Sequence, residues 1–552
     1  MPILTTLIFL PILGSLLLLA LPQALRATYR WITVVLCVLH LVLSSWIWHT
    51  FDPQLVGHQF IENTDWITMA LGQFGIVSID YSLGVDGLSL PMVWLTSLVM
   101  LVGAVSSFEI KTNEKAYYAL YLLLMGTVVG CFVALDLFLF FLFFEFMLLP
   151  MYFLIGLWGG PRREYASLKF FIYTLAGSVF ILLVMIGLYL SVIDPAETGL
   201  SIGLVSNPSE ITQDVVAQVQ TMIARQQIDP AQLVHTFEIP YLNDGRNFVP
   251  ESLLSTLAGH EIFGLSARLV AFLLLFIGFA VKLPMVPLHT WLPDAHVEAP
   301  TPISVVLAGI LLKIGGYGFF RIAYEIFPDG AIYFASWIAG LGVLSIVYGA
   351  FNALSQKDMK RLIAYSSVSH MGFVLLGLAA LTPEGANAAI YQLFSHGILS
   401  PMLFLVVGVV YARTHDRNID HYQGLALSMP AYTGLTAIAF FASLGLPGFS
   451  GFVGEFFSLL GAFNSIYIPV WMVVLAGFGL ILGAGYFLWT FQRVFLGKRW
   501  SLYEESLLPD LNFREKIMLV PLALLSLFFG ILPGTVFSIT EGYVMEFMKH
   551  FG

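Results

Sequence analysis

Six ionisable side chains lie inside long apolar runs of this 552-residue chain: Glu145, Lys282, Lys313, His370, His396 and Glu455. Placing an acidic or lysine side chain at the centre of a bilayer is unfavourable by about 2.5 to 3.5 kcal/mol, so the two glutamates and two lysines together cost about 10 to 14 kcal/mol. Ionisable residues inside a membrane mark ion or proton pathways. We therefore take these six residues as the candidate site.

These residue types support proton transfer. Burial disfavours the charged form of a lysine and a nearby carboxylate favours it, so changing the contacts of the carboxylate makes the lysine hold or release a proton. Histidine titrates near neutral pH and passes protons on through water. We predict that Glu145 pairs with Lys282, that Lys313 follows, that one of the two histidines comes next, and that Glu455 is the exit group. The sequence leaves the pairing and the order open.

Structural roles are the alternative for the same residues. The charged groups would then be ion pairs that pack helices together, and His370 and His396 would form hydrogen bonds between helices. Asp136 and Lys169 lie nearer the ends of their spans and are weaker candidates.

Other chemistry finds little support in the sequence. His289 and His296 are seven positions apart, which is not the spacing of four that puts two metal ligands on one face of a helix. Cys37 and Cys131 are isolated in apolar spans and form no pattern typical of an iron–sulfur site or a disulfide framework. We expect no metal site and no cofactor site in this chain.

Two candidate residues lie beside predicted helix breaks. Pro284 and Pro287 follow Lys282, and each proline removes an amide donor and clashes with the preceding turn. The segment SLGLPGFSGFVGE (443–455) places a second Gly- and Pro-rich break just before Glu455. A break inside a bilayer is tolerated only where protein or a water-filled cavity satisfies the freed backbone groups. Paired broken helices indicate a transport site near the membrane midplane.

The elements that position these residues are transmembrane helices. Hydrophobic residues make up 58% of the chain and charged residues 11%, and the apolar residues occur in runs of about twenty. The fold is predicted to be an all-α polytopic membrane protein with about fourteen transmembrane helices. We expect spans near 4–21, 31–49, 87–107, 117–135, 137–157, 168–192, 266–296, 302–325, 331–353, 361–381, 387–411, 430–462, 468–492 and 516–538.

Basic residues predict the orientation of these spans. They follow the odd-numbered spans, at Arg26, Arg30, Lys111, Lys115, Arg162, Arg163, Lys357, Lys360, Arg361, Arg413, Arg417, Arg493, Lys498, Arg499, Arg514 and Lys516. The positive-inside rule then places these loops in the cytoplasm and both termini outside. The long acidic loop at 193–265 falls on the outer side, where we expect a solvated cap with a short surface helix at 211–227.

The two breaks are separated by five spans, and an odd number of spans inverts one copy relative to the other. We therefore predict two inverted five-helix repeats, each with one broken helix. The predicted units are 1–115 (helices one to three and an outer-side loop), 116–330 (first repeat, helices four to eight, with the loop 193–265), 331–495 (second repeat, helices nine to thirteen) and 496–552 (last helix and tail).

Four motifs carry a resemblance to a known family: VKLPMVPLHTWLPDAHVEAPTPISVVLAGILLKIGGYG, FFEFMLLPMYFLIGLWGG, SQKDMKRLIAYSSVSHMGF and GLPGFSGFVGEF. Their order and content resemble the antiporter-like membrane subunits of respiratory complex I, over about 85–552 apart from 193–260. The resemblance implies a fourteen-helix fold with two inverted repeats. It assigns the coupled pair to Glu145 and Lys282, the central lysine to Lys313, relay roles to His370 and His396, and the terminal group to Glu455.

The resemblance also distinguishes members of the family. Its sister subunits are expected to carry lysine where this chain has Glu455. No lateral helix is predicted after the fourteenth span, which argues against the distal sister subunit. The loop at 193–260 is longer than the family pattern leads us to expect.

The resemblance implies a function that the residues alone do not disclose. The chain would be a proton-translocating subunit of NADH:quinone oxidoreductase, driven by electron transfer in other subunits. FMN, iron–sulfur clusters and quinone would be bound by those partners, so the chain itself would do no redox chemistry. Its partners would be other membrane subunits of complex I, especially sister antiporter-like subunits, in a bacterial cytoplasmic (inner) membrane.

Three alternatives remain open. The chain could belong to a multi-subunit sodium/proton antiporter, which shares the lysine and broken-helix motifs and lacks quinone-linked activity. It could also belong to an energy-converting hydrogenase or to the photosynthetic relative of complex I. As a passive scaffold, it would tolerate replacement of Lys282 or Glu145 by alanine without loss of pumping.

Overall fold

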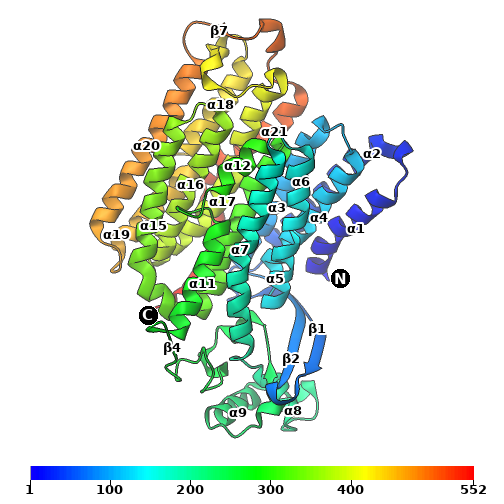
Figure 1. Cartoon of the computed structure of the whole chain (residues 1–552), viewed down its shortest axis with the longest axis vertical. Coiled ribbons are helices and arrows are strands. Elements are labelled where there is room, and N and C mark those ends of the chain that lie inside the picture. The colour runs from blue at the N-terminus through cyan, green and yellow to red at the C-terminus, as the bar shows by residue number, and fades with distance from the viewer. Residues whose placement is uncertain (1) are drawn as a thin grey trace.

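The computed structural model describes residues 2–552 and is dominated by helices that run side by side in one bundle (Figure 1). In this described part, 11 helices are long and apolar enough to cross a membrane. They are α1 (Ile3–Ala20), α2 (Arg26–Thr50), α3 (Ser89–Ser106), α4 (Glu114–Val133), α5 and α6 as one span (Leu137–Phe146, Leu148–Trp158), α7 (Arg163–Tyr189), α13 and α14 as one span (Thr301–Val306, Leu312–Gly318), α15 (Pro328–Ser355), α16 (Met359–Ala379), α17 (Pro383–Thr414) and α20 (Val470–Phe495).

Three further spans are broken or bent. They are α11 with α12 (Ala267–Lys282, Trp291–Glu298), α18 with α19 (Pro430–Ser443, Ser450–Asn464) and α21 with α22 (Phe513–Ile531, Gly534–Met548), the last pair bent by 64°. Within residues 2–552 these pairs complete the predicted set of about fourteen spans. In Figure 1 the chain rises from α11 to α12 and descends from α18 to α19, as inverted repeats require.

The first break lies where the sequence predicts it. Helix α11 ends at Lys282 and α12 begins at Trp291, with Pro284 and Pro287 between them. The backbone N–H of Val286 donates to Ser345 Oγ at 3.0 Å, and the Trp291 indole donates to the carbonyl oxygen of Val281 at 2.8 Å. Protein groups therefore satisfy part of the backbone that the prolines free.

The second break depends on glycine. Between α18 and α19, Gly445 and Gly448 have φ angles of +79° and +98°, which side-chain-bearing residues rarely adopt. The two glycines lie in the break just before the helix that carries Glu455.

A cap covers one end of the bundle (Figure 1). It contains the hairpin β1 (Gln59–Ala70) and β2 (Ile76–Val85), the short strand β3 (Val234–His235), and helices α8 (Pro195–Ser201), α9 (Gln213–Ala224) and α10 (Ile239–Leu242). Helix α9 confirms the predicted surface helix. The hairpin is an addition to the predicted all-α architecture. Strand β2 is buried along nearly its whole length, so it lacks the alternation of apolar and polar residues that predicts a half-exposed strand.

Two carboxyl groups in the cap are partly or fully buried. Asp194 caps α8 by accepting hydrogen bonds from the backbone N–H groups of Ala196 and Glu197. Burial raises the pKa of Asp194 to about 7. Burial also raises the pKa of Glu197 to about 7, and the nearby carboxylates of Asp80 and Asp65 raise it further. The cap therefore contains carboxyl groups that titrate near neutral pH.

Both termini lie at the cap end of the bundle. The backbone N–H of Leu4 donates to Glu62 Oε1 of the hairpin at 2.8 Å. Near the other terminus, the ring of Phe551 lies 6.3 Å from the ring of Tyr324 at the cap end of its span. The small antiparallel pair β4 (Glu261–Ile262) and β5 (Leu265–Ser266) leads from the cap into α11, and the pair β6 (Tyr422–Gln423) and β7 (Trp500–Ser501) lies at the opposite end (Figure 1).

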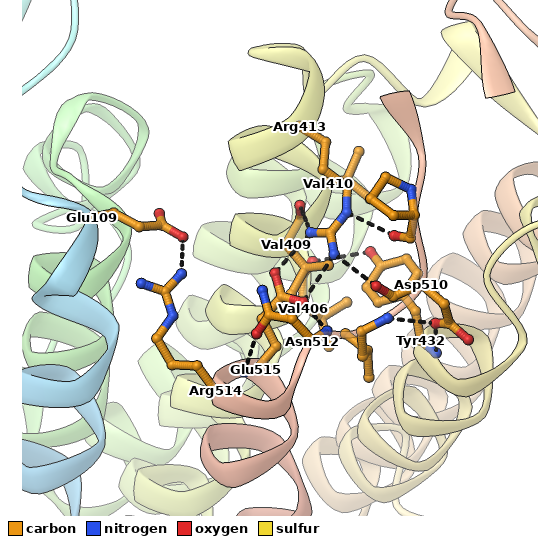
Figure 2. A network of polar contacts seen from close by, with 12 residues as sticks. Glu109, Val406, Val409, Val410, Arg413, Tyr432, Asp510, Asn512, Arg514 and Glu515 are labelled. Atoms are coloured by element: carbon orange, nitrogen blue, oxygen red, sulfur yellow. Dashed lines mark hydrogen bonds and ion pairs between the residues drawn. The ribbon is translucent and has the colours of Figure 1, made fainter. Parts of the chain in front are cut away.

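A polar network fixes the start of α21 at the end opposite the cap (Figure 2). Arg413 on α17 forms two hydrogen bonds with Glu515, at 2.8 and 2.9 Å, and donates to the carbonyl oxygen of Pro509 at 2.9 Å. Asn512 and Glu515 form a capping box at the first turn of α21. Arg514 forms an ion pair with Glu109 after α3. The last span is therefore tied to two helices far away in the sequence.

Candidate proton-transfer site

Lys313 lies at the centre of the bundle. Its span is interrupted by π-helical turns at Leu307–Leu311 and Phe319–Tyr324, and such turns frequently occur at functional sites. The Lys313 side chain is fully buried, and its Nζ donates to the carbonyl oxygen of Ala308 at 2.5 Å. The same Nζ lies 2.7 Å from Nδ1 of His396 on α17. A lysine and a histidine thus share a hydrogen bond deep inside the protein.

The contacts continue from His396 towards the second broken helix. The His396 ring lies 5.7 Å from the His370 ring on α16, centroid to centroid. His370 Nδ1 lies 2.7 Å from Glu455 Oε1 on α19. On its other side, His396 Nε2 lies 3.2 Å from Ser367 Oγ. The structure therefore brings together four of the six predicted residues, and it orders the two histidines that the sequence left unordered.

A small cavity is lined by both histidines. Its volume is about 10 Å³, and it is lined by His370, Gln392, His396, Ser400, Ser443 and Glu455, among others. His370 Nε2 and Gln392 Oε1 are buried and have no hydrogen-bond partner among the described residues. A cavity of this size is at the lower limit for one water molecule, which would need polar partners of this kind. A water molecule there can bond to His370 Nε2 and Gln392 Oε1 and lies beside the His396 ring, whose two nitrogens already contact Lys313 and Ser367.

Gln392 was not predicted from the sequence. Its side chain is buried in α17, one turn before His396. Gly454 leaves the space that it fills, since a Cβ at position 454 would lie 2.1 Å from Gln392 Oε1. Gln392 could have been predicted from the sequence, because it is a glutamine within an apolar span and lies four positions before the candidate His396.

Lys282 and Glu145 form a separate pair of candidates. Lys282 Nζ lies 4.8 Å from the centre of the Phe144 ring and 5.7 Å from that of Phe170, which are cation–π distances. Lys282 Nζ and Glu145 Oε1 have no hydrogen-bond partner in the described part of the chain. No hydrogen bond or ion pair joins Glu145 to Lys282 among residues 2–552, but their charges interact at longer range, so the predicted pairing stays a prediction. The ring of Phe144 occupies the space beside the lysine, and the Glu145 side chain is only half-buried.

His296 was weighed in the sequence only as a metal ligand. It is fully buried in α12, and its ring stacks on that of Phe404 with centroids 4.4 Å apart. Neither ring nitrogen has a hydrogen-bond partner among residues 2–552. His289, the other histidine of this segment, lies beside Tyr348 with ring centroids 5.4 Å apart. A buried histidine without partners is available for proton transfer near the first broken helix.

A second cavity opens at the end of the bundle opposite the cap. It has a volume of about 520 Å³, and its lining includes Glu298, Lys360, His415 and Arg417. Lys360 is buried, and its Nζ donates to the carbonyl oxygen of Ala299. Nearby, Asp294 on α12 binds Lys169 Nζ at 2.7 Å. Water in this cavity can approach the segment between α12 and α13.

Comparisons with known proteins agree with this geometry. The family described as "NADH:quinone oxidoreductase/Mrp antiporter, TM" matches residues 134–196 and 239–482, more than half of the chain. The NADH-quinone oxidoreductase subunit M of Rhodobacter capsulatus is 39% identical over 524 residues, covering 95% of this chain and 91% of that protein. The subunit M of Rickettsia bellii is 36% identical over 545 residues, covering 98% of this chain and 97% of that protein.

Solved structures give the same result. A chain of respiratory complex I from Thermus thermophilus with bound NADH aligns over 100% of both chains, with a TM-score of 0.77 and 30% identity. A chain of the Mrp complex from Dietzia sp. aligns over 100% of this chain and 99% of that chain, with a TM-score of 0.75 and 20% identity, and so shares the fold. This chain therefore belongs to the family of NADH:quinone oxidoreductase and Mrp antiporter membrane subunits.

Proposed function

We propose that this chain translocates protons across the membrane, as a subunit of the M type in an NADH:quinone oxidoreductase. The observation that carries the proposal is the buried series from Lys313 through His396 and His370 to Glu455, with contacts of 2.7 Å at both ends. Each member accepts and releases protons, and the cavity lined by both histidines has room for one water molecule, which His396 Nε2 reaches by giving up its contact with Ser367. The relay therefore has one short break, next to Gln392.

Protons enter from the end opposite the cap in this proposal. The cavity beside Lys360 is lined by Val297 and Glu298, which directly follow His296 in the first broken helix. Lys282 lies at the start of that break and is surrounded by aromatic rings, so its charge depends on the nearby Glu145. A change in the contacts or charge of Glu145 would then alter the protonation of Lys282 and start the transfer of a proton towards Lys313.

The energy comes from partners. Moving one proton against 100 mV requires about 2.3 kcal/mol, and we assign the source to electron transfer from NADH to quinone in other subunits. FMN, iron–sulfur clusters and quinone belong to those subunits in this proposal. Glu145 on α5 is partly exposed, although its Oε1 is buried, and this position suits contact with a sister antiporter-like subunit. The chain would reside in the bacterial inner membrane, with the cap and both termini outside.

A sodium/proton antiporter subunit is the second candidate, and the shared fold with the Mrp complex favours it. The two candidates differ in what drives transport. The test uses inverted membrane vesicles in sodium-free buffer, with NADH-driven acidification and quinone reduction measured together. The first proposal predicts acidification that depends on quinone reduction. A sodium requirement without quinone-linked acidification would support the second.

The relay is tested in the same vesicles with Lys282→Ala and Glu145→Ala, after assembly of the complex has been checked. We expect pumping and NADH oxidation to fall together in both variants. Lys111→Ala, at an exposed position between α3 and α4, is the control. Wild-type values for both variants in the assembled complex would show that the two charges are structural.

A further inference from the structure

The helix that carries Lys313 also carries a row of polar side chains towards the cap. Lys313, Tyr317, Arg321 and Glu325 occupy every fourth position, a spacing that places side chains on one face of a helix. All four are buried, with exposed fractions of 0, 1, 2 and 4%. Four polar residues buried in one row are costly in a membrane protein, which indicates a function. The relay through His396 leaves three of them unexplained.

The row is connected by hydrogen bonds at its outer half. Arg321 Nε lies 3.4 Å from the Tyr317 hydroxyl, and Arg321 Nη1 lies 3.2 Å from Glu325 Oε1. Arg321 also forms an ion pair with Asp86, just before α3. Tyr543 and Asn243 each donate to Glu325 at 2.7 Å. The carboxylates of Asp86 and Glu325 thus face the single guanidinium group of Arg321. Two ionised carboxylates and one guanidinium group together carry a net charge of about −1.

The row ends in a cavity at the cap end of the bundle. The cavity has a volume of about 310 Å³, and its lining includes His58, Asp86, Arg321, Glu325, Tyr543 and His550. His58 Nε2 is buried without a hydrogen-bond partner among the described residues and lies 3.7 Å from Asp86 Oδ2. Asn243 Oδ1 is likewise buried and unpartnered within residues 2–552. Unsatisfied polar atoms around a cavity of this size indicate bound water.

We propose that this row is a second proton route, which connects Lys313 with the cap-side cavity. A proton that leaves Lys313 is taken up by the Tyr317 hydroxyl, which gives up its own proton onward. Glu325 accepts it and releases it to water in the cavity. Arg321 stays charged throughout and acts as a positioning residue that holds Glu325 and Asp86. Only the bonds to the transferred protons form and break in these steps.

This route gives Lys313 two outlets, one through His396 and one through Tyr317. The side chain of Lys313 now contacts His396, and a lysine has a flexible stem that can reorient. The inference rests on the proposed function, because it takes Lys313 as a carrier of transported protons.

The test measures NADH-driven proton pumping per assembled complex in inverted vesicles. Tyr317→Phe removes only a hydroxyl group, and Glu325→Gln keeps the side-chain shape. Loss of a positioned proton carrier closes its own route, so we expect each variant to lower the pumping rate by about half, while the relay through His396 still carries protons. Glu325→Asp, which keeps the carboxyl group, should recover part of the rate. Tyr333→Phe and Glu541→Gln, at exposed positions, are the controls.

The outcomes separate this inference from the function on which it rests. A merely structural row would reduce assembly or heat stability and leave the rate per assembled complex unchanged. If Lys313→Ala abolishes pumping while Tyr317→Phe and Glu325→Gln pump at the wild-type rate, the second route is wrong and the proposed function stands. If Lys313→Ala also pumps normally, the proposed function is wrong as well.

Discussion

Four side chains from four helices meet in this protein at residue scale. Lys313, His396, His370 and Glu455 come from α14, α17, α16 and α19, and the first and last contacts are each 2.7 Å long. Such contacts allow direct proton transfer, whereas the 5.7 Å between the histidine rings requires a bridge. The rate of the relay should therefore depend on the group that holds the bridge.

Gln392→Leu tests that bridge. Leucine has a similar size but offers no partner to a water molecule, so we expect proton pumping per assembled complex to fall by about half, to the share that leaves Lys313 through Tyr317. Gln392→Glu restores an acceptor oxygen and should retain more activity than Gln392→Leu. Gln232→Leu, at an exposed position in the cap, is the control. An unchanged pumping rate in Gln392→Leu would show that protons cross between the histidines without this side chain.

Glu455→Gln tests the end of the relay. Glutamine can still bond to His370 but cannot carry a transferable proton at neutral pH, so we expect pumping to fall to the share that leaves Lys313 through Tyr317, with the complex assembled. Glu384→Gln, near the start of α17, provides a control at a position outside the relay. Full pumping by Glu455→Gln would remove Glu455 from the path and leave its contact with His370 as a packing interaction.

At the scale of elements, breaks and π-helical turns place the relay. Helices α11 and α18 stop at prolines or glycines next to candidate residues, and the Lys313 span widens on either side of the lysine. The breaks are readable from the sequence because prolines such as Pro284 and Pro287, and glycines such as Gly445 and Gly448 beside Pro447, disfavour a regular helix. The π-helical turns leave no comparable mark in residue type, so only the structure reveals them.

The network in Figure 2 allows a test of how the last span is held. Removing Arg413 leaves the buried Glu515 carboxylate without its ion-pair partner, which destabilises a protein by about 3 to 5 kcal/mol. We expect Arg413→Ala to lower the midpoint of thermal aggregation of the detergent-solubilised complex. Lys498→Ala, at an exposed position at the same end, is the control. Equal midpoints for both variants would mean that α21 is held mainly by its apolar contacts.

The cap should become less stable as the pH rises. The folded state raises the pKa of Asp194 and Glu197 to about 7, above their usual values of about 4. Between about pH 4 and 7 the folded cap therefore binds more protons than the unfolded cap, and its stability decreases as the pH increases. Amide hydrogen exchange in α8 and α9, corrected for intrinsic rates, should show less protection at pH 8 than at pH 6.

Asp194→Asn provides the matched variant for this prediction. Asparagine still caps α8 but does not titrate, so the loss of protection at pH 8 should become smaller. Asp229→Asn is the control. Asp229 is an exposed residue of the same loop that accepts a hydrogen bond from the backbone N–H of Ala231, and its replacement should leave the pH dependence unchanged. Equal protection at both pH values in the wild-type protein would contradict the prediction.

At the scale of the whole molecule, long apolar runs account for most of what can be predicted. They predict about fourteen spans and place both termini at one end, because each span needs about twenty apolar residues. The four relay residues are predictable because a charge in such a run is costly. Their order is not, since it depends on how α14, α16, α17 and α19 pack. The buried strand β2 and the aromatic rings beside Lys282 also depend on packing.

The unit boundaries at 115, 330 and 495 remain a prediction. The opposite directions of the two broken helices in Figure 1 agree with an inverted arrangement. The cap and the two termini share one end of the molecule, and the basic loops with the 520 Å³ cavity occupy the other. A route between the two ends must pass the centre of the bundle, where Lys313 lies.

The most direct measurement is therefore proton pumping and quinone reduction in inverted vesicles that carry Lys313→Ala. The complex must be assembled, as judged by its amount and subunit content, and Lys313→Arg serves as the variant that keeps a charge without releasing protons. The account predicts that both activities fall together in both variants, because neither can pass a proton to His396. Wild-type pumping by the assembled Lys313→Ala complex would contradict the account.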